Sequence, residues 1–220
     1  ELGEAAASPP SWLTGGEGFD RSVVSFRWRA GQDALLLNAL DDGGLDLLTI
    51  SRTLLSQPRV LVEHEDELPV GISTFSSGGG GVIAMNRCSV DAPSELWVLD
   101  GSGMRLLWNP NRWLADKRVV RPEAGWVTPR GEDPIPYWLY RPADASPDAA
   151  RSIVAWLGEG PGSMLGPGMF DDWFATQMLV ARGYAVVQVN PRGAAGYGQQ
   201  VRRRVYRDFV RGPSRDVLAV

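Results

Sequence analysis

The chain has 220 residues, of which 44% are hydrophobic and 22% are charged, which is ordinary for a globular protein with a sizeable core. Its 22 basic and 26 acidic residues give a formal net charge of −4. This mild acidity argues against nucleic acid or an anionic membrane surface as a partner, because both favour a clustered basic face. No apolar stretch approaches the roughly 20 residues that cross a bilayer.

The single cysteine, Cys88, excludes an intramolecular disulfide. Nothing in the sequence indicates an oxidising compartment, so we expect a cytoplasmic protein. The first residues, ELGEAAASPPSWL, lack an initiator methionine and the charged and apolar regions of a signal peptide. We therefore expect the chain to be a piece of a longer protein.

Up to about residue 120, short apolar runs separated by polar turns predict many short strands. Residues 34–40 and 45–50 flank the turn DDGG, and residues 81–86, 95–100 and 104–108 repeat the pattern of strand, connection and strand. The two passages begin 47 positions apart, at 34 and 81, a spacing found in β-propeller blades. An antiparallel sandwich would give the same pattern, so the residues alone leave both architectures open.

After residue 120 the pattern changes to that of an α/β fold. Residues 136–142 alternate as a strand, and residues 153–157 and 184–189 are continuous apolar runs, typical of parallel strands covered on both faces. Between these two runs, residues 170–182 repeat apolar positions at helical spacing. Strand, helix and strand predict a βαβ unit, and we place the boundary between the two halves near residues 119–126.

A last helix is expected around residues 199–209, where Val201, Val205 and Phe209 recur every four positions. The arginines between them then form its solvated polar face. Nucleic-acid binding would need aromatic stacking platforms or a wider basic surface, which this segment lacks.

Two glycine-rich loops follow the two parallel strands, where ligand sites gather in such sheets. Residues 158–169, GEGPGSMLGPGM, are longer than usual for a strand-to-helix loop. Residues 190–198, NPRGAAGYG, follow the second strand. Neither loop has the glycine pattern or the Lys-Ser/Thr ending of a nucleotide-binding loop, so we expect no nucleotide or other cofactor.

The same segments carry a family resemblance. Residues 181–198, ARGYAVVQVNPRGAAGYG, are similar over nearly their whole length to a motif of the prolyl oligopeptidase family of serine peptidases. Residues 153–162 resemble the family's strand and HGGPG loop, and residues 133–144 resemble its first hydrolase strands. Residues 91–100 resemble a segment of the last propeller blade. The acylaminoacyl-peptidase and dipeptidyl-aminopeptidase branches are the most similar.

This resemblance implies a fold class and a function. Residues 1–124 would be the last blades of a β-propeller, and residues 125–220 the first half of an α/β-hydrolase domain. The parent protein would be a serine peptidase that cleaves short peptides, releasing aminoacyl or acylaminoacyl residues through an acyl-enzyme. The propeller would exclude folded proteins from the site. The resemblance leaves open whether the protein assembles into a homo-oligomer.

The resemblance also implies candidate site residues. The first loop corresponds to the oxyanion-hole loop of the family, represented by Gly158, Glu159 and Gly160. The family carries His or Tyr where this chain has Gly158, and losing one oxyanion donor typically costs about 10²–10³ in rate. The second loop corresponds to a scaffold on the active-site side, with Arg192, Gly193 and Tyr197.

The catalytic triad is expected downstream of Val220, because no G-x-S-x-G elbow occurs in the sequence. The nearest approximation, residues 212–216, is interpreted as a turn in which Ser214 caps a helix over residues 215–220. The only histidine, His64, lies among acidic residues in an expected exposed loop. One His and one Cys are too few for a zinc site, and Cys88 is expected to be half-buried.

Three hypotheses stay open. The chain is a fragment of an active peptidase that needs a separate C-terminal segment, or a catalytically inactive relative that acts as a binding module, or part of an esterase-type α/β-hydrolase. With nothing after Val220, we expect the strand over residues 184–189 to lose a neighbour and to expose an apolar edge.

Overall fold

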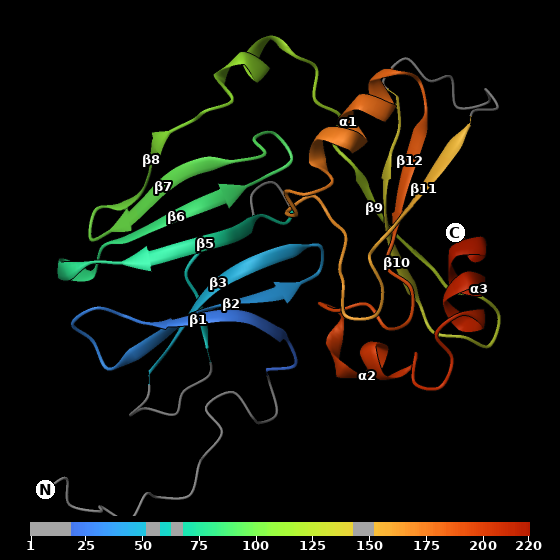
Figure 1. Ribbon diagram of the computed structural model, residues 1–220, viewed down its shortest axis with the longest axis horizontal. Helices are drawn as coiled ribbons and strands as arrows, with labels where there is room; N and C mark the ends of the chain where they lie inside the picture. The colour runs from blue at the N-terminus through green and yellow to red at the C-terminus, as the bar shows by residue number, and fades with distance from the viewer. Residues whose placement is uncertain (1–18, 52–57, 63–67, 143–151) are drawn as a thin grey trace, which may run out of the picture.

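The computed structural model describes residues 19–51, 58–62, 68–142 and 152–220, which form two β-sheets (Figure 1). The first sheet holds eight strands within these ranges. They are β1 (Ser22–Trp28), β2 (Ala34–Asp41), β3 (Gly44–Ser51), β4 (Arg59–Val60), β5 (Gly71–Ser77), β6 (Ile83–Cys88), β7 (Glu95–Asp100) and β8 (Gly103–Trp108). Short 3-10 helices cover Gly79–Gly81 (η1) and Arg112–Asp116 (η2).

The first sheet consists of two antiparallel meanders, β1-β2-β3-β4 and β5-β6-β7-β8. One parallel pair, Leu45 with Gly71, joins them. The strand pairs predicted from the sequence are confirmed as β2 with β3 and as β6 with β7 and β8. His64 and the acidic run around it lie outside the described residues.

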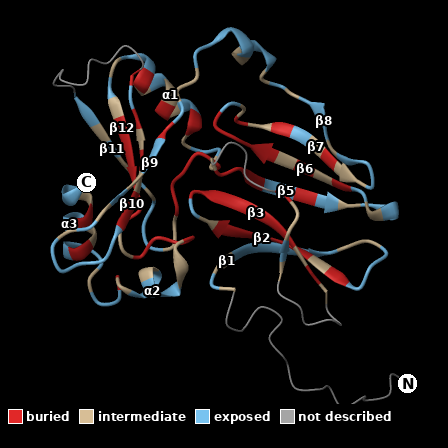
Figure 2. Ribbon diagram, turned by 180° about the vertical axis from the view of Figure 1, so that it is seen from behind, coloured by how far each residue is buried: buried red, intermediate tan, exposed pale blue. Residues whose placement is uncertain are grey.

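The core of the first sheet lies where the two meanders pack together. Side chains of β2, β3, β5 and β6 form one buried cluster that includes Leu36, Leu47, Ile72, Ile83 and Met85. Figure 2 shows this burial along the central strands, whereas β1 at the edge is exposed over most of its length. Burial of these large apolar side chains is the main favourable contribution to folding.

The second sheet contains β9 (Glu123–Val127), β10 (Ile135–Tyr140), β11 (Ile153–Leu157) and β12 (Ala185–Val189), in the order β11-β12-β10-β9. Helix α1 (Trp173–Ala181) connects the parallel strands β11 and β12, which confirms the predicted βαβ unit. Strand β10 pairs with β12 in the antiparallel direction.

Helix α1 covers one face of the second sheet, but not with all of the residues that its periodicity predicts. Trp173, Thr176 and Val180 are buried, whereas Phe174 and Met178 are exposed. The Trp173 indole donates a hydrogen bond of 2.8 Å to the carbonyl of Val90, in the connection between β6 and β7. Thr176 and Val180 are buried on the same side of the helix as Trp173, whereas Met178 is not.

The expectation of an open edge on the strand over residues 184–189 is wrong. That strand, β12, has β10 on one side and β11 on the other. The edge strands of the described sheet are β11 and β9, and Ile153 and Leu157 of β11 are 67% and 53% exposed. The sheet order differs from the chain order because β10 pairs with β12, whose paired residues lie 46 to 52 positions further along the chain.

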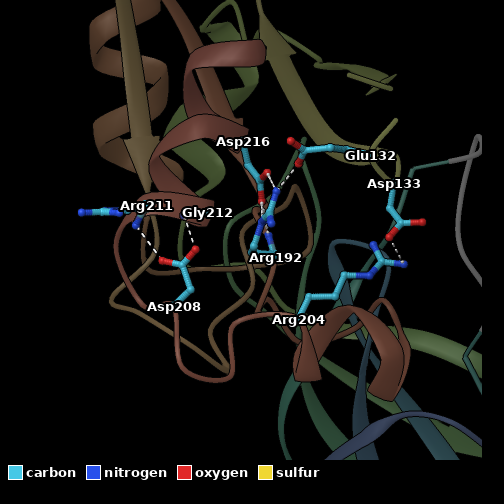
Figure 3. Close-up of polar contacts among 8 residues, drawn as sticks. All are labelled: Glu132, Asp133, Arg192, Arg204, Asp208, Arg211, Gly212 and Asp216. Carbon is cyan, nitrogen blue, oxygen red and sulfur yellow. Dashed lines mark hydrogen bonds and ion pairs between the residues drawn. The ribbon is translucent and has the colours of Figure 1, made fainter. Parts of the chain in front are cut away.

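The C-terminal segment forms two short helices, α2 (Gly198–Arg203) and α3 (Arg211–Ala219). The predicted helix over residues 199–209 therefore ends early, and the predicted helix at 215–220 begins four residues sooner. The Asp208 carboxylate accepts hydrogen bonds of 2.9 Å from the N–H groups of Arg211 and Gly212 (Figure 3). Asp208 thus caps α3 in the place of Ser214, which lies inside the helix.

The two sheets meet through glycine backbone. A Cβ added to Gly71 would lie 1.8 Å from the carbonyl oxygen of Gly168, and one added to Gly166 would lie 2.2 Å from the Cα of Gly43. The N–H of Gly168 donates to the carbonyl of Gly43 at 3.0 Å. The loop after β11 therefore lies directly on the turn between β2 and β3, with no room for side chains.

This contact gives a stability prediction. Gly166→Ala forces a methyl group against the backbone of the β2–β3 turn, and we expect it to lower the free energy of unfolding by about 1–3 kcal/mol. Urea denaturation measures this loss. Gly101→Ala is the matched control, since no atom lies within 4 Å of the added Cβ. Equal midpoints for the two variants would contradict the contact.

Candidate active site at the carboxyl ends of β11 and β12

A pocket of about 460 Å³ opens where β11 and β12 end. The loop after β11 contributes Gly158, Gly160 and Ser163, and the loop after β12 contributes Asn190 and Arg192. Apolar side chains of the C-terminal segment close the other wall; they include Val205, Phe209, Val217 and Leu218. The two glycine-rich loops singled out in the sequence thus meet at one site.

The two loops are joined by backbone hydrogen bonds. The N–H of Gly162 donates to the carbonyl of Gly193 at 2.8 Å, and the N–H of Ala195 donates to the carbonyl of Ser163 at 3.0 Å. Gly193 has a φ of +94°, and a Cβ there would lie 2.8 Å from Val205. A glycine is required at this position on both counts, which explains the sequence RGAAG after a buried strand.

Gly158 lies against the hydroxyl of Ser163. A Cβ on Gly158 would be 2.3 Å from Ser163 Oγ, which donates a hydrogen bond of 2.6 Å to the carbonyl of Gly160. The serine hydroxyl therefore occupies the space that a side chain at position 158 would need. Glu159 is exposed and does not line the pocket.

The N–H groups of Glu159 and Gly160 bond to no other part of the described chain. Gly160 lines the pocket, and its φ of +136° is one that L side chains rarely adopt. A turn with unused N–H groups beside a pocket can donate hydrogen bonds to an anionic ligand oxygen.

Arg192 ties the second loop to α3 (Figure 3). Its Nε and backbone N–H donate to Asp216 Oδ2 at 2.9 and 2.8 Å, and Nη2 donates to Oδ1 at 2.6 Å. Nη2 also contacts Glu132, from the segment between β9 and β10. The hydrogen bonds to Asp216 hold the pKa of Arg192 above its ordinary value.

Tyr197 packs beneath the second loop. Its hydroxyl accepts a hydrogen bond of 3.1 Å from the side-chain amide of Asn190. Its ring meets Trp126 of β9 edge-to-face, with the centroids 5.8 Å apart. Burial raises the pKa of the phenol, so it stays protonated at physiological pH. Tyr197 does not line the pocket.

The described residues hold no group of three or more His, Cys, Asp or Glu side chains that could bind a metal ion. No helix in the same ranges is long and apolar enough to cross a membrane. Cys88, the last residue of β6, is 1% exposed rather than half-buried.

Sequence reasoning missed three residues that shape the site: Ser163, Asn190 and Asp216. Asn190 stands directly after a buried strand, a position that could have pointed to a role in fixing the loop. Asp216 was missed because its partner, Arg192, lies 24 positions earlier and the sequence pattern does not specify that pairing. Ser163 bonds to a backbone carbonyl only three positions earlier, and nothing in its own sequence distinguishes it from other loop serines.

Comparisons with known structures show the class of fold. The chain aligns with an acylaminoacyl peptidase solved in complex with Z-Gly-Gly-Phe-chloromethyl ketone, with a TM-score of 0.78 and 20% identity over 92% of this chain and 30% of the other. An acylaminoacyl peptidase of Pyrococcus horikoshii gives a TM-score of 0.77, at 19% identity and the same coverage. The described fold is thus that of one part of such peptidases.

Sequence comparisons show a similarity to one family of peptidases. Residues 170–220 match the model of the prolyl oligopeptidase family. An uncharacterized peptidase of Bacillus subtilis, YuxL, is 31% identical over 121 residues, 54% of this chain and 18% of its own length. Dipeptidyl-peptidase 5 of Trichophyton schoenleinii is 21% identical over 92% of this chain and 28% of its own. The predicted relationship to the prolyl oligopeptidase family is confirmed, and the chain spans less than a third of these relatives.

The Arg192–Asp216 pair gives a second prediction. Asp216→Ala leaves the partly buried guanidinium without its main partner, and we expect a loss of about 2–4 kcal/mol in the free energy of unfolding. The control is Asp91→Ala, which breaks an ion pair with Arg121 whose side chains are each about half exposed; such pairs contribute about 0–1 kcal/mol. Similar losses in urea denaturation would contradict the structural role of Asp216.

Cys88 gives a prediction on pH. Burial raises the pKa of its thiol from 9.0 to about 12, so the thiolate fraction at a given pH falls by about three orders of magnitude. We expect the native chain to resist a thiol reagent that labels the denatured chain quickly. Because the folded state keeps its proton longer, this contribution to stability is complete below pH 9.0 and is lost as the pH rises towards about 12. Equal labelling rates for native and denatured chains would contradict the burial of the Cys88 thiol.

Proposed function

We propose that the chain is part of a serine peptidase that cleaves short peptides and releases aminoacyl or acylaminoacyl residues. The observation that carries this proposal is the pocket at the ends of β11 and β12, where two glycine-rich loops are bonded to each other and the N–H groups of Glu159 and Gly160 in the first loop bond to no other part of the described chain. The family match and the fold shared with acylaminoacyl peptidases support it.

The chemistry would follow the acyl-enzyme route. A serine hydroxyl attacks the carbonyl carbon of the scissile bond while a histidine takes its proton; the histidine then gives that proton to the departing amine. Water hydrolyses the resulting ester and restores the serine. Residues of this chain would form the walls of the pocket. They would also supply the turn at Glu159 and Gly160, whose N–H groups would stabilise the negative charge that develops on the substrate oxygen.

The triad would come from a further C-terminal segment. Strand β11 has a free edge among the described strands, and edge strands are templates for pairing. Leu157 of β11 and Leu218 of α3 line the same apolar pocket, which such a segment would cover. We propose that a strand added to β11 brings the nucleophile to the pocket.

The two halves would then have separate tasks. In this proposal residues 1–124 are the last blades of a β-propeller that admits short peptides only, and residues 125–220 are the first half of an α/β-hydrolase domain. The two meanders of the first sheet, each of four strands, support this division. They also weigh against an esterase that has no such module.

A second candidate is a catalytically inactive relative that binds peptides. The observation in its favour is Gly158, where Ser163 Oγ occupies the place of a side chain that could donate to the oxyanion. A turn with backbone donors alone would retain only part of the usual stabilisation.

Fluorophosphonate labelling, read by intact mass, tests the function. The 220-residue chain by itself is expected to give no label and no release from aminoacyl or acylaminoacyl peptide substrates, because it contains no complete triad. A longer form that includes the C-terminal segment is expected to be labelled once, with heat-denatured protein as the control. Turnover by the pure 220-residue chain would overturn the assignment. A folded, unlabelled longer form would support the inactive relative.

A further inference from the structure

Asn190 is a polar residue at the centre of the candidate site that the proposed mechanism does not use. It follows the last residue of β12 directly and is 2% exposed. Its backbone N–H donates to the carbonyl of Pro136 on β10 at 3.0 Å, so its position is fixed by the second sheet. A buried amide in such a position is stable only when its donors and acceptor are satisfied.

The side chain of Asn190 satisfies the backbone of the opposite loop. Its Oδ1 accepts a hydrogen bond of 2.8 Å from the N–H of Leu165, and its Nδ2 donates one of 2.8 Å to the carbonyl of the same residue. Nδ2 also donates to the Tyr197 hydroxyl. The amide thus bonds to both the N–H and the carbonyl of Leu165, as a neighbouring β-strand would, although Leu165 belongs to no strand.

Leu165 is linked through a short path to the turn beside the pocket. Ser163, two residues earlier, donates its N–H at 3.1 Å and its hydroxyl at 2.6 Å to the carbonyl of Gly160. Its own carbonyl accepts from Ala195. A shift of Leu165 would therefore move Ser163 and, with it, the N–H groups of Glu159 and Gly160.

We propose that Asn190 is a positioning residue: it holds the loop after β11 so that the N–H groups of the turn at Glu159 and Gly160 keep a fixed place beside the pocket. The catalytic role of this turn rests on the proposed function. The positioning of the loop by Asn190 does not depend on that function. A misplacement of about 1 Å in such a turn can cost on the order of a hundredfold in rate.

The first test is amide hydrogen exchange of the 220-residue chain. Asn190→Ala is expected to speed exchange of the Leu165 and Gly162 amides by about tenfold or more, because two hydrogen bonds to Leu165 and the loop alignment are lost. Asn38→Ala is the matched control: Asn38 is 1% exposed on β2 and also bonds across to backbone, with Ser25 N–H and the Ile72 carbonyl. Unchanged exchange at Leu165 in Asn190→Ala would overturn the proposal.

The second test is kinetic and uses the longer form without the fluorophosphonate label. Asn190→Ala is expected to lower kcat by about 10–10² with KM within about twofold, because the donors act on the transition state more than on bound substrate. Asn38→Ala, compared at a temperature where both variants stay folded, is expected to keep wild-type kcat. Equal loss in both variants would reduce Asn190 to a stability role and overturn the positioning role. If the wild-type longer form has no activity, the proposed function is contradicted. The amide-exchange result alone then decides whether Asn190 positions the loop.

Discussion

The structure depends on a backbone contact that excludes side chains. Gly166 and Gly168 of the loop after β11 lie against Gly43 and Gly44 of the β2–β3 turn and against Gly71 of β5, at distances where a Cβ would overlap backbone atoms. The loop after β11 forms one wall of the pocket. Because this loop lies on the first sheet, the position of that wall depends on a sheet that shares no strand with the second sheet. The residues that line the pocket thus all come from the second half of the chain, while the first half holds one of its loops in place.

From this fixed loop the rest of the site follows. Hydrogen bonds from Gly162, Ala195 and the Asn190 amide join the two loops after the parallel strands. Arg192 then carries the connection onward to Asp216 of α3 (Figure 3). Loop, loop and helix form one continuous polar framework around an apolar pocket, an arrangement suited to holding backbone donors rigidly where charge develops.

The sequence predicted what is local. Alternation and apolar runs located the strand pairs and the βαβ unit, since burial of side chains dictates these patterns. The free edge on β11 was missed because strand order depends on the non-local pairing of β10 with β12. Asp208 was missed as the cap of α3, since Ser214 offered an equally good local signal. At the site, the loops could be predicted, but the pairing of Asn190 with Leu165 could not, because the two residues lie 25 positions apart.

Native-state amide exchange measured by NMR tests whether the first sheet holds the loops of the site. The Gly168 N–H bonds to Gly43 and the Asp42 N–H bonds to Gly196, so both report on the contact between the halves. We expect these two amides to be as protected as those of the central strands and to open together with them. Exchange at the rate of an unstructured loop, with the strands still protected, would contradict it.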